Sequence, residues 1–270
     1  MKKNIKYVLC VIMILGIYTL FLFFAQVLHK TGNAPVINAP SSVLQVSVKD
    51  KDKVLLNGVT ASDDEDGNLT SEVFIESISN FDDQMRRTVT YAVFDSDDNL
   101  SRTTRQIQYT DYKAPEINIK KALCYYYVTS SEQYKDYVSA KSVVDGNISS
   151  QISVEREFYD GDNHYVTYSV TDSCGMKTSL TLKTTEQNRE PNIDITLKKY
   201  LLRVKKGTTI NPYEYIKNVN VMGIKNDSLK SLIEIQNDYN PNEEGMYEFI
   251  YRISRSNGDY GITKLVVIVE

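Results

Sequence analysis

The stretch TVTYAVFDSDDN, residues 88–99, decides the fold. Apolar and polar side chains alternate along its first part, which is typical of a β-strand with one buried face. The DSDDN that follows consists of polar turn-forming residues, so the strand ends there. The pattern returns as YVTYSVTDSCGM, residues 165–176, and as FIYRISRSNGD, residues 249–259. Three copies of a strand that runs into a turn are therefore predicted.

Two further landmarks recur in the same order, at intervals of about 80 residues. Repeating units of solenoid proteins are about 20–50 residues long, whereas a unit of this length can close its own core. We therefore expect three beads in series, and a proline near the start of each favours a short, stiff linker. The landmarks are APVIN (34–38), APEIN (114–118) and EPNID (190–194), then DGNLTS (66–71), DGNISS (145–150) and the blurred NDSLKS (226–231).

Each bead is predicted to be all-β. The segments TRQIQYT, TSLTLKTT and TKLVVIVE end the three repeats as closing strands, and Tyr, Val, Ile and Thr, which favour strands, are abundant. Beyond the N-terminal segment, no stretch keeps a helical pattern over 12 residues. Several short antiparallel strands joined by turns indicate a β-sandwich in each repeat.

The N-terminal segment has a different character. Residues 7–28, YVLCVIMILGIYTLFLFFAQVL, contain no charged side chain. As a helix they would span about 33 Å, and the hydrocarbon core of a bilayer is about 30 Å thick. We predict one transmembrane helix in the cell membrane, and the lysines before it place residues 1–6 in the cytoplasm and the bulk outside. A cleaved signal peptide is the alternative, although its apolar part is normally shorter.

Repeat 1 resembles a bacterial immunoglobulin-like (Ig-like) module. The resemblance is carried by APVIN, GVTASDDEDGNLTSEV and TVTYAVFDSDDNLSRTTRQIQY. Such tandem modules occur on Gram-positive surface proteins and in some pesticidal crystal proteins, and they resemble hyalin repeats. Repeat 2 matches in part and repeat 3 is degenerate. The resemblance implies Ig-like sandwiches and an extracellular accessory or adhesive role, and it supplies no catalytic residue. The predicted domains are Ig-like domains at 34–112 and 113–188 and a degenerate one at 189–270.

An acidic run in repeat 1 suggests two roles. Carboxylates are the ligands that Ca²⁺ prefers, and those of a second loop could approach them. However, the EF-hand pattern fails, because Ser62 and Val73 stand where it needs acidic ligands. Calcium is therefore a possible cofactor only, and no other cofactor is indicated. The calcium candidates are Asp63, Asp64, Asp66, Asp95 and Asp97.

The second role of the acidic run is a structural turn, because repeats 1 and 2 share Asp-Gly-Asn but not the extra carboxylates. Gly67 and Gly146 allow positive φ, and Asp66 and Asp145 are predicted to cap their own turns with a side-chain oxygen.

Catalysis is not indicated, and we expect no enzyme. The two histidines lie outside any nucleophile or zinc motif, and we expect His164 to be exposed in a hairpin turn. Residues 7–270 carry 28 Lys and Arg (31 minus the three lysines before residue 7) and 35 Asp and Glu, a net charge of −7, which argues against nucleic acid as a partner. Cys124 and Cys174 are too few for a disulfide framework, and one bridge between them stays open.

Tyrosines give the remaining binding signal. In CYYYV, residues 124–128, alternation predicts Tyr125 and Tyr127 on one side and Tyr126 on the other. One side belongs to the core, and the other could stack on a ligand. We expect a membrane-anchored, surface-displayed binding, adhesion or spacer module, with a cell-envelope protein or cell-wall glycan as partner. The alternatives are a structural component of an envelope complex without its own ligand, and a calcium-dependent adhesin.

Overall fold

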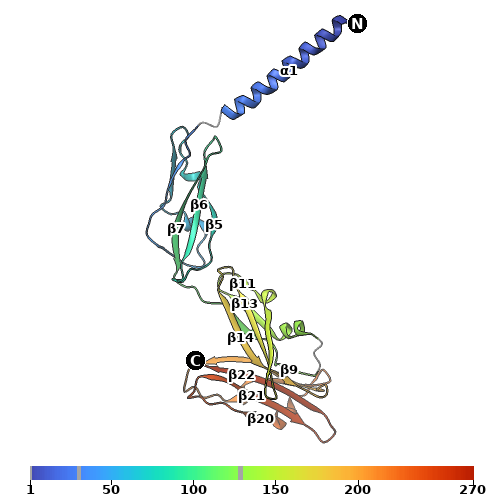
Figure 1. Cartoon of the computed structure of the whole chain (residues 1–270). Coiled ribbons are helices and arrows are strands. Elements are labelled where there is room, and N and C mark those ends of the chain that lie inside the picture. Colours follow the sequence, from blue (N-terminus) through green and yellow to red (C-terminus); the bar gives the residue numbers. More distant parts are fainter. Residues whose placement is uncertain (1, 29–31, 127–129) are drawn as a thin grey trace. The chain divides into compact units, whose positions relative to one another are not determined.

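The computed structural model describes residues 2–28, 32–126 and 130–270, and within the N-terminal helix it describes side chains for residues 12–25 (Figure 1). This helix, α1, spans Lys2–Leu28. A search of the described residues finds no helix of sufficient length and apolar character to cross a bilayer, so the predicted transmembrane span at residues 7–28 has no support from it. Tyr127, which was predicted to share the side of Tyr125, lies outside the described residues.

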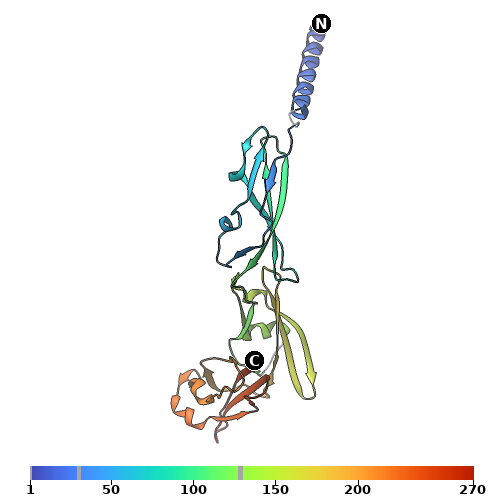
Figure 2. The ribbon, with the colours of Figure 1, turned by 90° about the vertical axis from the view of Figure 1, so that its left-hand side faces the viewer.

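Beyond α1 the chain is built from β-strands, as the sequence predicts, and it divides into two compact units, residues 1–112 and 113–270. Repeat 1 forms the sandwich of the first unit (Figure 2). One sheet has the order β1-β3-β4 and the other β2-β7-β6-β5. Its elements are β1 (Val36–Asn38), β2 (Leu44–Val46), α2 (Asp52–Leu55), β3 (Thr60–Asp63), β4 (Gly67–Asn68), η1 (Thr70–Glu72), β5 (Phe74–Ile78), β6 (Arg87–Phe94) and β7 (Leu100–Tyr109).

Repeat 2 uses the same plan within the second unit. Its sheets have the orders β11-β10-β8 and β12-β13-β14, and β15 and β9 form a separate short pair. Its elements are β8 (Glu116–Ile119), β9 (Cys124–Tyr125), η2 (Ser131–Tyr137), β10 (Val138–Ser142), β11 (Gly146–Asn147), η3 (Ser149–Gln151), β12 (Ser153–Asp160), β13 (Asn163–Thr171), β14 (Lys177–Lys183) and β15 (Thr185–Glu186).

Repeat 3, predicted to be degenerate, has the same succession of strands. Its two sheets have the orders β16-β18-β19 and β17-β22-β21-β20. Its elements are β16 (Ile193–Leu197), β17 (Leu201–Val204), η4 (Pro212–Tyr215), β18 (Ile216–Val221), β19 (Ile224–Lys225), η5 (Asp227–Leu232), β20 (Glu234–Asn237), β21 (Gly245–Ser254) and β22 (Tyr260–Val269).

The opening segment of every repeat has two halves that pair in different ways. Its first half pairs antiparallel, as β1 does with β3, and its second half pairs parallel with the end of the repeat. The parallel pairs are β2 with β7, β9 with β15 and β17 with β22. Because buried side chains of both sheets meet in one core per repeat, each repeat is a sandwich of the generic Ig-like kind.

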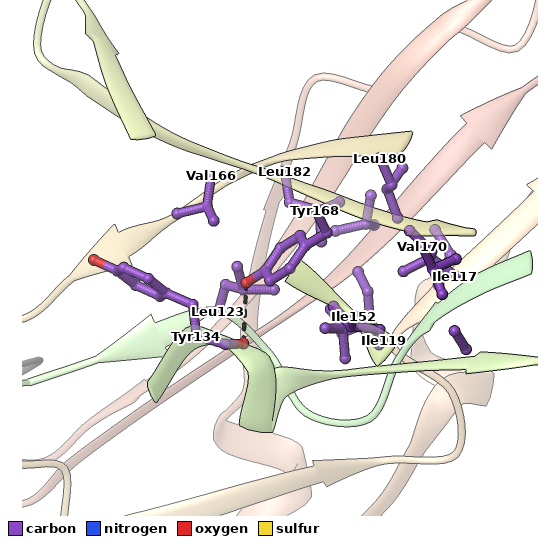
Figure 3. Close-up of a cluster of buried hydrophobic side chains, with 14 of the residues drawn as sticks. Ile117, Ile119, Leu123, Tyr134, Ile152, Val166, Tyr168, Val170, Leu180 and Leu182 are labelled. Atoms are coloured by element: carbon purple, nitrogen blue, oxygen red, sulfur yellow. Dashed lines mark hydrogen bonds between the residues drawn. The ribbon is translucent and has the colours of Figure 1, made fainter. Parts of the chain in front are cut away.

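One tyrosine marks the centre of each core. Tyr91, Tyr168 and Tyr251 are fully buried, and Figure 3 shows Tyr168 among the aliphatic side chains of repeat 2. A buried phenol needs a hydrogen-bond partner, and each hydroxyl donates to a backbone carbonyl in the short helix between the second and third strands of its repeat. The acceptors are the carbonyl oxygens of Leu55 at 2.6 Å, Tyr134 at 3.2 Å and Pro212 at 2.8 Å.

Repeats 2 and 3 share an interface, which differs from the prediction of separate beads for these two repeats. Strand β22 is buried on both of its faces. Leu265 and Val267 lie in the core of repeat 3, whereas Val266 and Leu201 belong to the cluster of repeat 2. Tyr200 packs against both clusters. The apolar run at the end of the chain therefore serves two cores.

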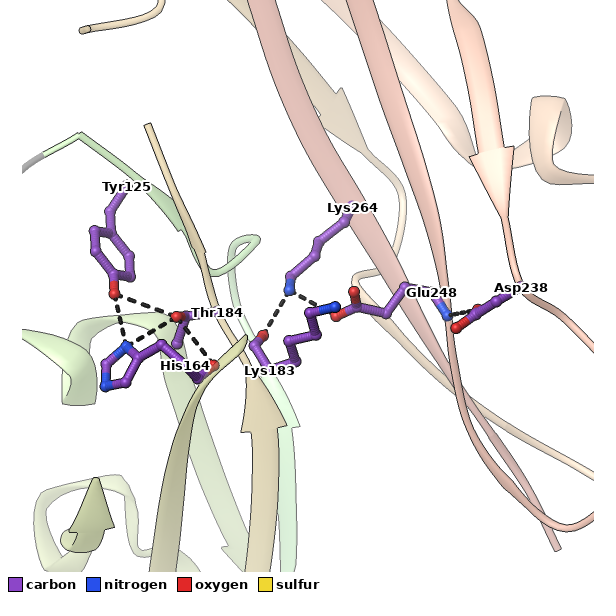
Figure 4. A network of polar contacts seen from close by, with 7 residues as sticks. All are labelled: Tyr125, His164, Lys183, Thr184, Asp238, Glu248 and Lys264. Atoms are coloured by element: carbon purple, nitrogen blue, oxygen red, sulfur yellow. Dashed lines mark hydrogen bonds and ion pairs between the residues drawn. The ribbon is translucent and has the colours of Figure 1, made fainter. Parts of the chain in front are cut away.

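A buried ion pair lies in this interface (Figure 4). The Lys264 side chain is fully buried, and its Nζ donates to Glu248 Oε1 at 2.6 Å and to the Lys183 carbonyl oxygen at 2.5 Å. Lys183 ends strand β14 of repeat 2, and Lys264 lies in β22 of repeat 3. A buried ammonium without these acceptors would be costly, so the contact fixes how the two repeats meet.

Candidate functional site

The acidic loops of repeat 1 are held by their own carboxylates. Asp63 Oδ1 accepts the backbone N–H groups of Glu65 and Asp66 at 2.8 and 3.1 Å, which lowers the pKa of this carboxyl below its usual value. Asp66 Oδ2 accepts the N–H of Ser96 from the next loop at 2.7 Å. Asp95 Oδ1 accepts the N–H of Asn99 at 2.7 Å and that of Asp97 at 2.9 Å.

The remaining calcium candidates face residues just before the first strand of repeat 1. Asp64 Oδ2 accepts a hydrogen bond from Asn33 Nδ2 at 2.9 Å. Asp97 lies close to Gly32: a Cβ atom added to Gly32 would stand 2.8 Å from Asp97 Oδ2. Within the described residues, no three His, Cys, Asp or Glu side chains gather in a way that could hold a metal ion. The five carboxylates of the calcium hypothesis are therefore spread over two loops and bind mainly backbone N–H groups.

Repeat 2 has the same hydrogen bond between its two loops, and we call this bond the tie. Asp145 Oδ2 accepts the N–H of Ser173 at 2.9 Å, as Asp66 does with Ser96. Gly67 and Gly146 have φ of +75° and +73°. Asp66 and Asp145, which were predicted to cap their own turns, each accept a backbone N–H group of the neighbouring loop.

The turn caps lie three positions earlier in the chain. They are Asp63 in repeat 1 and Ser142 in repeat 2, whose Oγ accepts the N–H groups of Val144 and Asp145. Among the described residues of repeat 3, neither the cap nor the tie has a counterpart. Its turn is shortened to Met222 and Gly223, both at positive φ, and Arg255 stands where Asp95 and Asp172 begin the second loop.

His164 is less exposed than predicted. The β12–β13 hairpin turns at Gly161, so His164 pairs with Tyr159 inside the ladder and only 11% of its side chain is exposed. Its Nδ1 lies 3.0 Å from both Tyr125 Oη and Thr184 Oγ1 (Figure 4). The prediction of an exposed turn histidine is therefore wrong, and the ring belongs to a polar network with Tyr125 and Thr184.

A groove runs along the junction of repeats 2 and 3, and we call it the junction groove. Its first hollow has a volume of about 630 Å³. The turn between β16 and β17 contributes Lys198 and Lys199, and strand β18 contributes Lys217. Lys120, from the end of β8, and Arg203, from β17, complete a cationic wall that faces one carboxylate, Glu116.

Two further hollows continue the groove toward tyrosines. A hollow of about 240 Å³ shares Tyr200 with the cationic one, and a hollow of about 680 Å³ shares Cys124, Tyr137 and Pro191 with the second. Tyr126, 47% exposed, lines the last hollow, whereas Tyr125 is buried, in agreement with the predicted alternation. The groove thus has a cationic end and an aromatic end.

The groove contains one thiol. Burial raises the pKa of Cys124 to about 11, so the thiolate, which is the nucleophilic form, is scarce near neutral pH. Neither Cys124 nor Cys174 takes part in a disulfide, which answers the question left open by the sequence.

A signal for the cationic end is present in the sequence and was missed. After its first strand, repeat 2 reads NIKKAL and repeat 3 reads TLKKYL, so a lysine pair stands at the same place in both. Repeat 1 reads INAPSS there. The two pairs face one groove only because repeats 2 and 3 pack together, and local patterning does not reveal that packing.

No family model matches the chain, and no curated protein matches it either. The more specific kinship to the modules of pesticidal crystal proteins or to hyalin repeats therefore stays a prediction.

Among solved structures, the chain is similar to the M60 catalytic domain with the CBM51-1 and CBM51-2 domains of Clostridium perfringens ZmpB, with a TM-score of 0.24, 10% identity, and coverage of 87% of this chain and 30% of that one. It is also similar to the CBM51-2 domain in complex with GlcNAc and the INT domains of the same protein, with a TM-score of 0.23, 18% identity, and coverage of 56% of this chain and 41% of that one. For human CDH23 EC21-23 the TM-score is 0.21, the identity is 10%, and the coverage is 87% of this chain and 100% of that one. The chain spans less than half the length of both ZmpB chains. TM-scores this low carry no argument for this chain.

Proposed function

We propose that the chain is a non-catalytic, surface-displayed binding module that takes a cell-envelope glycan into the junction groove. The observation that supports this most is the aromatic end of the groove, where Tyr126 and Tyr137 line a hollow with Glu190 and Pro191. Sugar rings present apolar faces that stack on tyrosine, and a carboxylate such as Glu190 accepts hydrogen bonds from hydroxyl groups.

The loops of repeat 1 are weaker candidates for contact with a glycan. Asp63, Asp66 and Asp95 are engaged by backbone N–H groups of their own loops. A ligand that used these carboxylates would have to replace those hydrogen bonds, whereas the junction groove offers side chains that are already exposed. This contrast favours the second unit as the binding end.

Display at the surface rests on residues 7–28, which we propose as the membrane anchor, with residues 1–6 in the cytoplasm and the repeats outside. The uncharged sequence supports this, as does the exposure of every large apolar side chain described in α1, from Ile12 to Phe24. Extraction of cell membranes with alkaline carbonate should leave the full chain in the pellet. A protease added to intact cells should remove repeats 1 to 3.

The glycan proposal is tested by measuring the affinity of the full chain for purified cell-wall glycan, with calorimetry or surface plasmon resonance. Loss of a stacking ring costs about 1–3 kcal/mol where stacking has been measured on nucleobases, so we expect Tyr126→Ala to weaken binding at least about fivefold. Tyr213→Ala is the matched control, because Tyr213 is 56% exposed and lies outside the described lining of the groove. Equal affinity of wild type and Tyr126→Ala would contradict the proposal.

A further inference from the structure

We infer that the glycan in the junction groove is acidic and that its carboxylate or phosphate groups bind at the lysine end. This inference rests on the proposed function and adds the chemical class of the ligand. It starts from the ion pairs of the cationic wall. Arg203 is shared between Glu116 at 3.7 Å and Glu270 at 3.0 Å, so two carboxylates already balance its charge.

The four lysines of the wall are different. Within the described residues, no ion pair joins Lys120, Lys198, Lys199 or Lys217 to an acidic side chain. All four are exposed around one hollow of about 630 Å³. Ammonium groups on the same hollow repel one another, and an anion placed between them relieves that repulsion.

The surrounding chain strengthens this argument, because it carries a net charge of −4. A polyanion is repelled by most of such a surface, so a local cationic hollow determines where it approaches. The hollow between the two ends of the groove also contains a cation, because Lys121 Nζ lies 4.3 Å from the centroid of the Tyr137 ring. A sugar chain with acidic groups can stack on the tyrosines and pair with the lysines, whereas a neutral sugar chain offers the lysines no anionic partner.

Unit 1 provides an internal comparison. Lys49, Lys51 and Lys53 surround a hollow of about 480 Å³ that no described aromatic side chain lines. Asp50 lies among them. This second lysine cluster is also cationic but has no tyrosines, so it separates site-specific binding from attraction to lysine alone.

The test uses the full chain in neutral detergent and three probes: polygalacturonate, polyphosphate and neutral dextran. We expect one of the polyanions to bind, and the triple variant Lys120→Gln, Lys198→Gln, Lys199→Gln to weaken it about tenfold, since three exposed charge contacts are lost. The triple variant Lys49→Gln, Lys51→Gln, Lys53→Gln removes the same charge from unit 1 and should leave the affinity within about twofold. All six lysines are exposed, and circular dichroism checks that both variants fold.

The probes separate the outcomes. Binding of polygalacturonate alone assigns carboxylate as the recognised group, and binding of polyphosphate alone assigns phosphate; both support the inference. Equal weakening by the two triple variants would overturn it, because the attraction would then be nonspecific. If cell-wall glycan binds through Tyr126 and neither polyanion binds, the inference fails and the proposed function stands. If neither the cell-wall glycan nor a polyanion binds, both fail.

Discussion

Repeat 1 and repeat 3 have the same succession of strands and use their polar side chains differently. In repeat 1, Asp63 and Asp66 close the turns at one end of the sandwich. In repeat 3, a shorter turn at Met222 and Gly223 takes the place of the turn that holds these carboxylates, and the buried charge, Lys264, faces repeat 2 instead. The difference teaches that loss of the turn motif did not cost repeat 3 its fold. The junction groove lies where repeat 3 meets repeat 2.

The largest predicted effect separates the two units. Lys264→Ala leaves Glu248 buried without its partner, and breaking such a pair costs about 3–5 kcal/mol. We expect the free energy of unfolding to fall by this amount for residues 113–270 and to stay unchanged for residues 32–112. Urea denaturation read by peptide-resolved hydrogen exchange measures both values on one sample.

A double variant is the control for this prediction. Lys264→Met combined with Glu248→Leu removes both charges from the interface and should recover most of the lost stability. Equal destabilisation of both units by Lys264→Ala would contradict the assignment of Lys264 to the junction, and so would the absence of any effect.

The next effect probes what the repeats share. Tyr91→Phe, Tyr168→Phe and Tyr251→Phe each delete one buried hydroxyl and leave a carbonyl oxygen without its donor. We expect each variant to lose about 1–2 kcal/mol, with similar values in the three repeats. The measurement is again urea denaturation, and a difference above about 2 kcal/mol between repeats would show that their cores are not equivalent.

A smaller effect tests the tie between the acidic loops. Asp66→Ala and Asp145→Ala remove the acceptors for the Ser96 and Ser173 N–H groups, so these two amides should exchange about fivefold faster, with about 1 kcal/mol lost locally. Asp97→Ala is the control, because none of the hydrogen bonds described above uses its side chain. Unchanged exchange at Ser96 in Asp66→Ala would contradict the tie.

The smallest effect depends on pH and compares two equivalent turn caps. Backbone N–H donors hold the pKa of Asp63 below its usual 3.8, so the folded turn prefers the carboxylate. The stabilisation is therefore present above pH 3.8 and is lost as the pH falls through the folded-state value. Ser142 caps the same turn in repeat 2 without a titrating group.

We expect protection of residues 63–67 from exchange to fall in this acid range, and the dependence on Asp63 to be absent from residues 142–146. In Asp63→Ser the two turns should respond alike. If repeat 1 keeps its acid response in that variant, the cause lies outside Asp63.

Much of the fold was predictable, because the alternating strands and their turns are local features. The period near 80 residues and strands such as TVTYAVF were enough to predict all-β sandwiches. The junction between repeats 2 and 3 depends on long-range packing. One sequence signal did exist: TKLVVIVE lacks the alternation of TRQIQYT and TSLTLKTT, and a strand buried on both faces reads as a continuous apolar run.

The candidate site was less predictable. The acidic run around Asp64 attracts attention in the sequence, yet its carboxylates mainly bind nearby N–H groups. The lysine pairs at 120–121 and 198–199 do not stand out in the sequence, because only folding brings them to one groove. His164 was misplaced because the length of the β12–β13 hairpin depends on where its turn forms.

The most direct test of the account is a hydrogen-exchange comparison of the full chain with and without polygalacturonate, or polyphosphate if that is the polymer that binds. We predict slower exchange in residues 116–126 and 190–203, which line the junction groove, and no change in residues 63–67 and 95–99 of repeat 1. Slower exchange confined to the acidic loops of repeat 1, with the groove unchanged, would contradict the claim that the junction of repeats 2 and 3 is the binding surface.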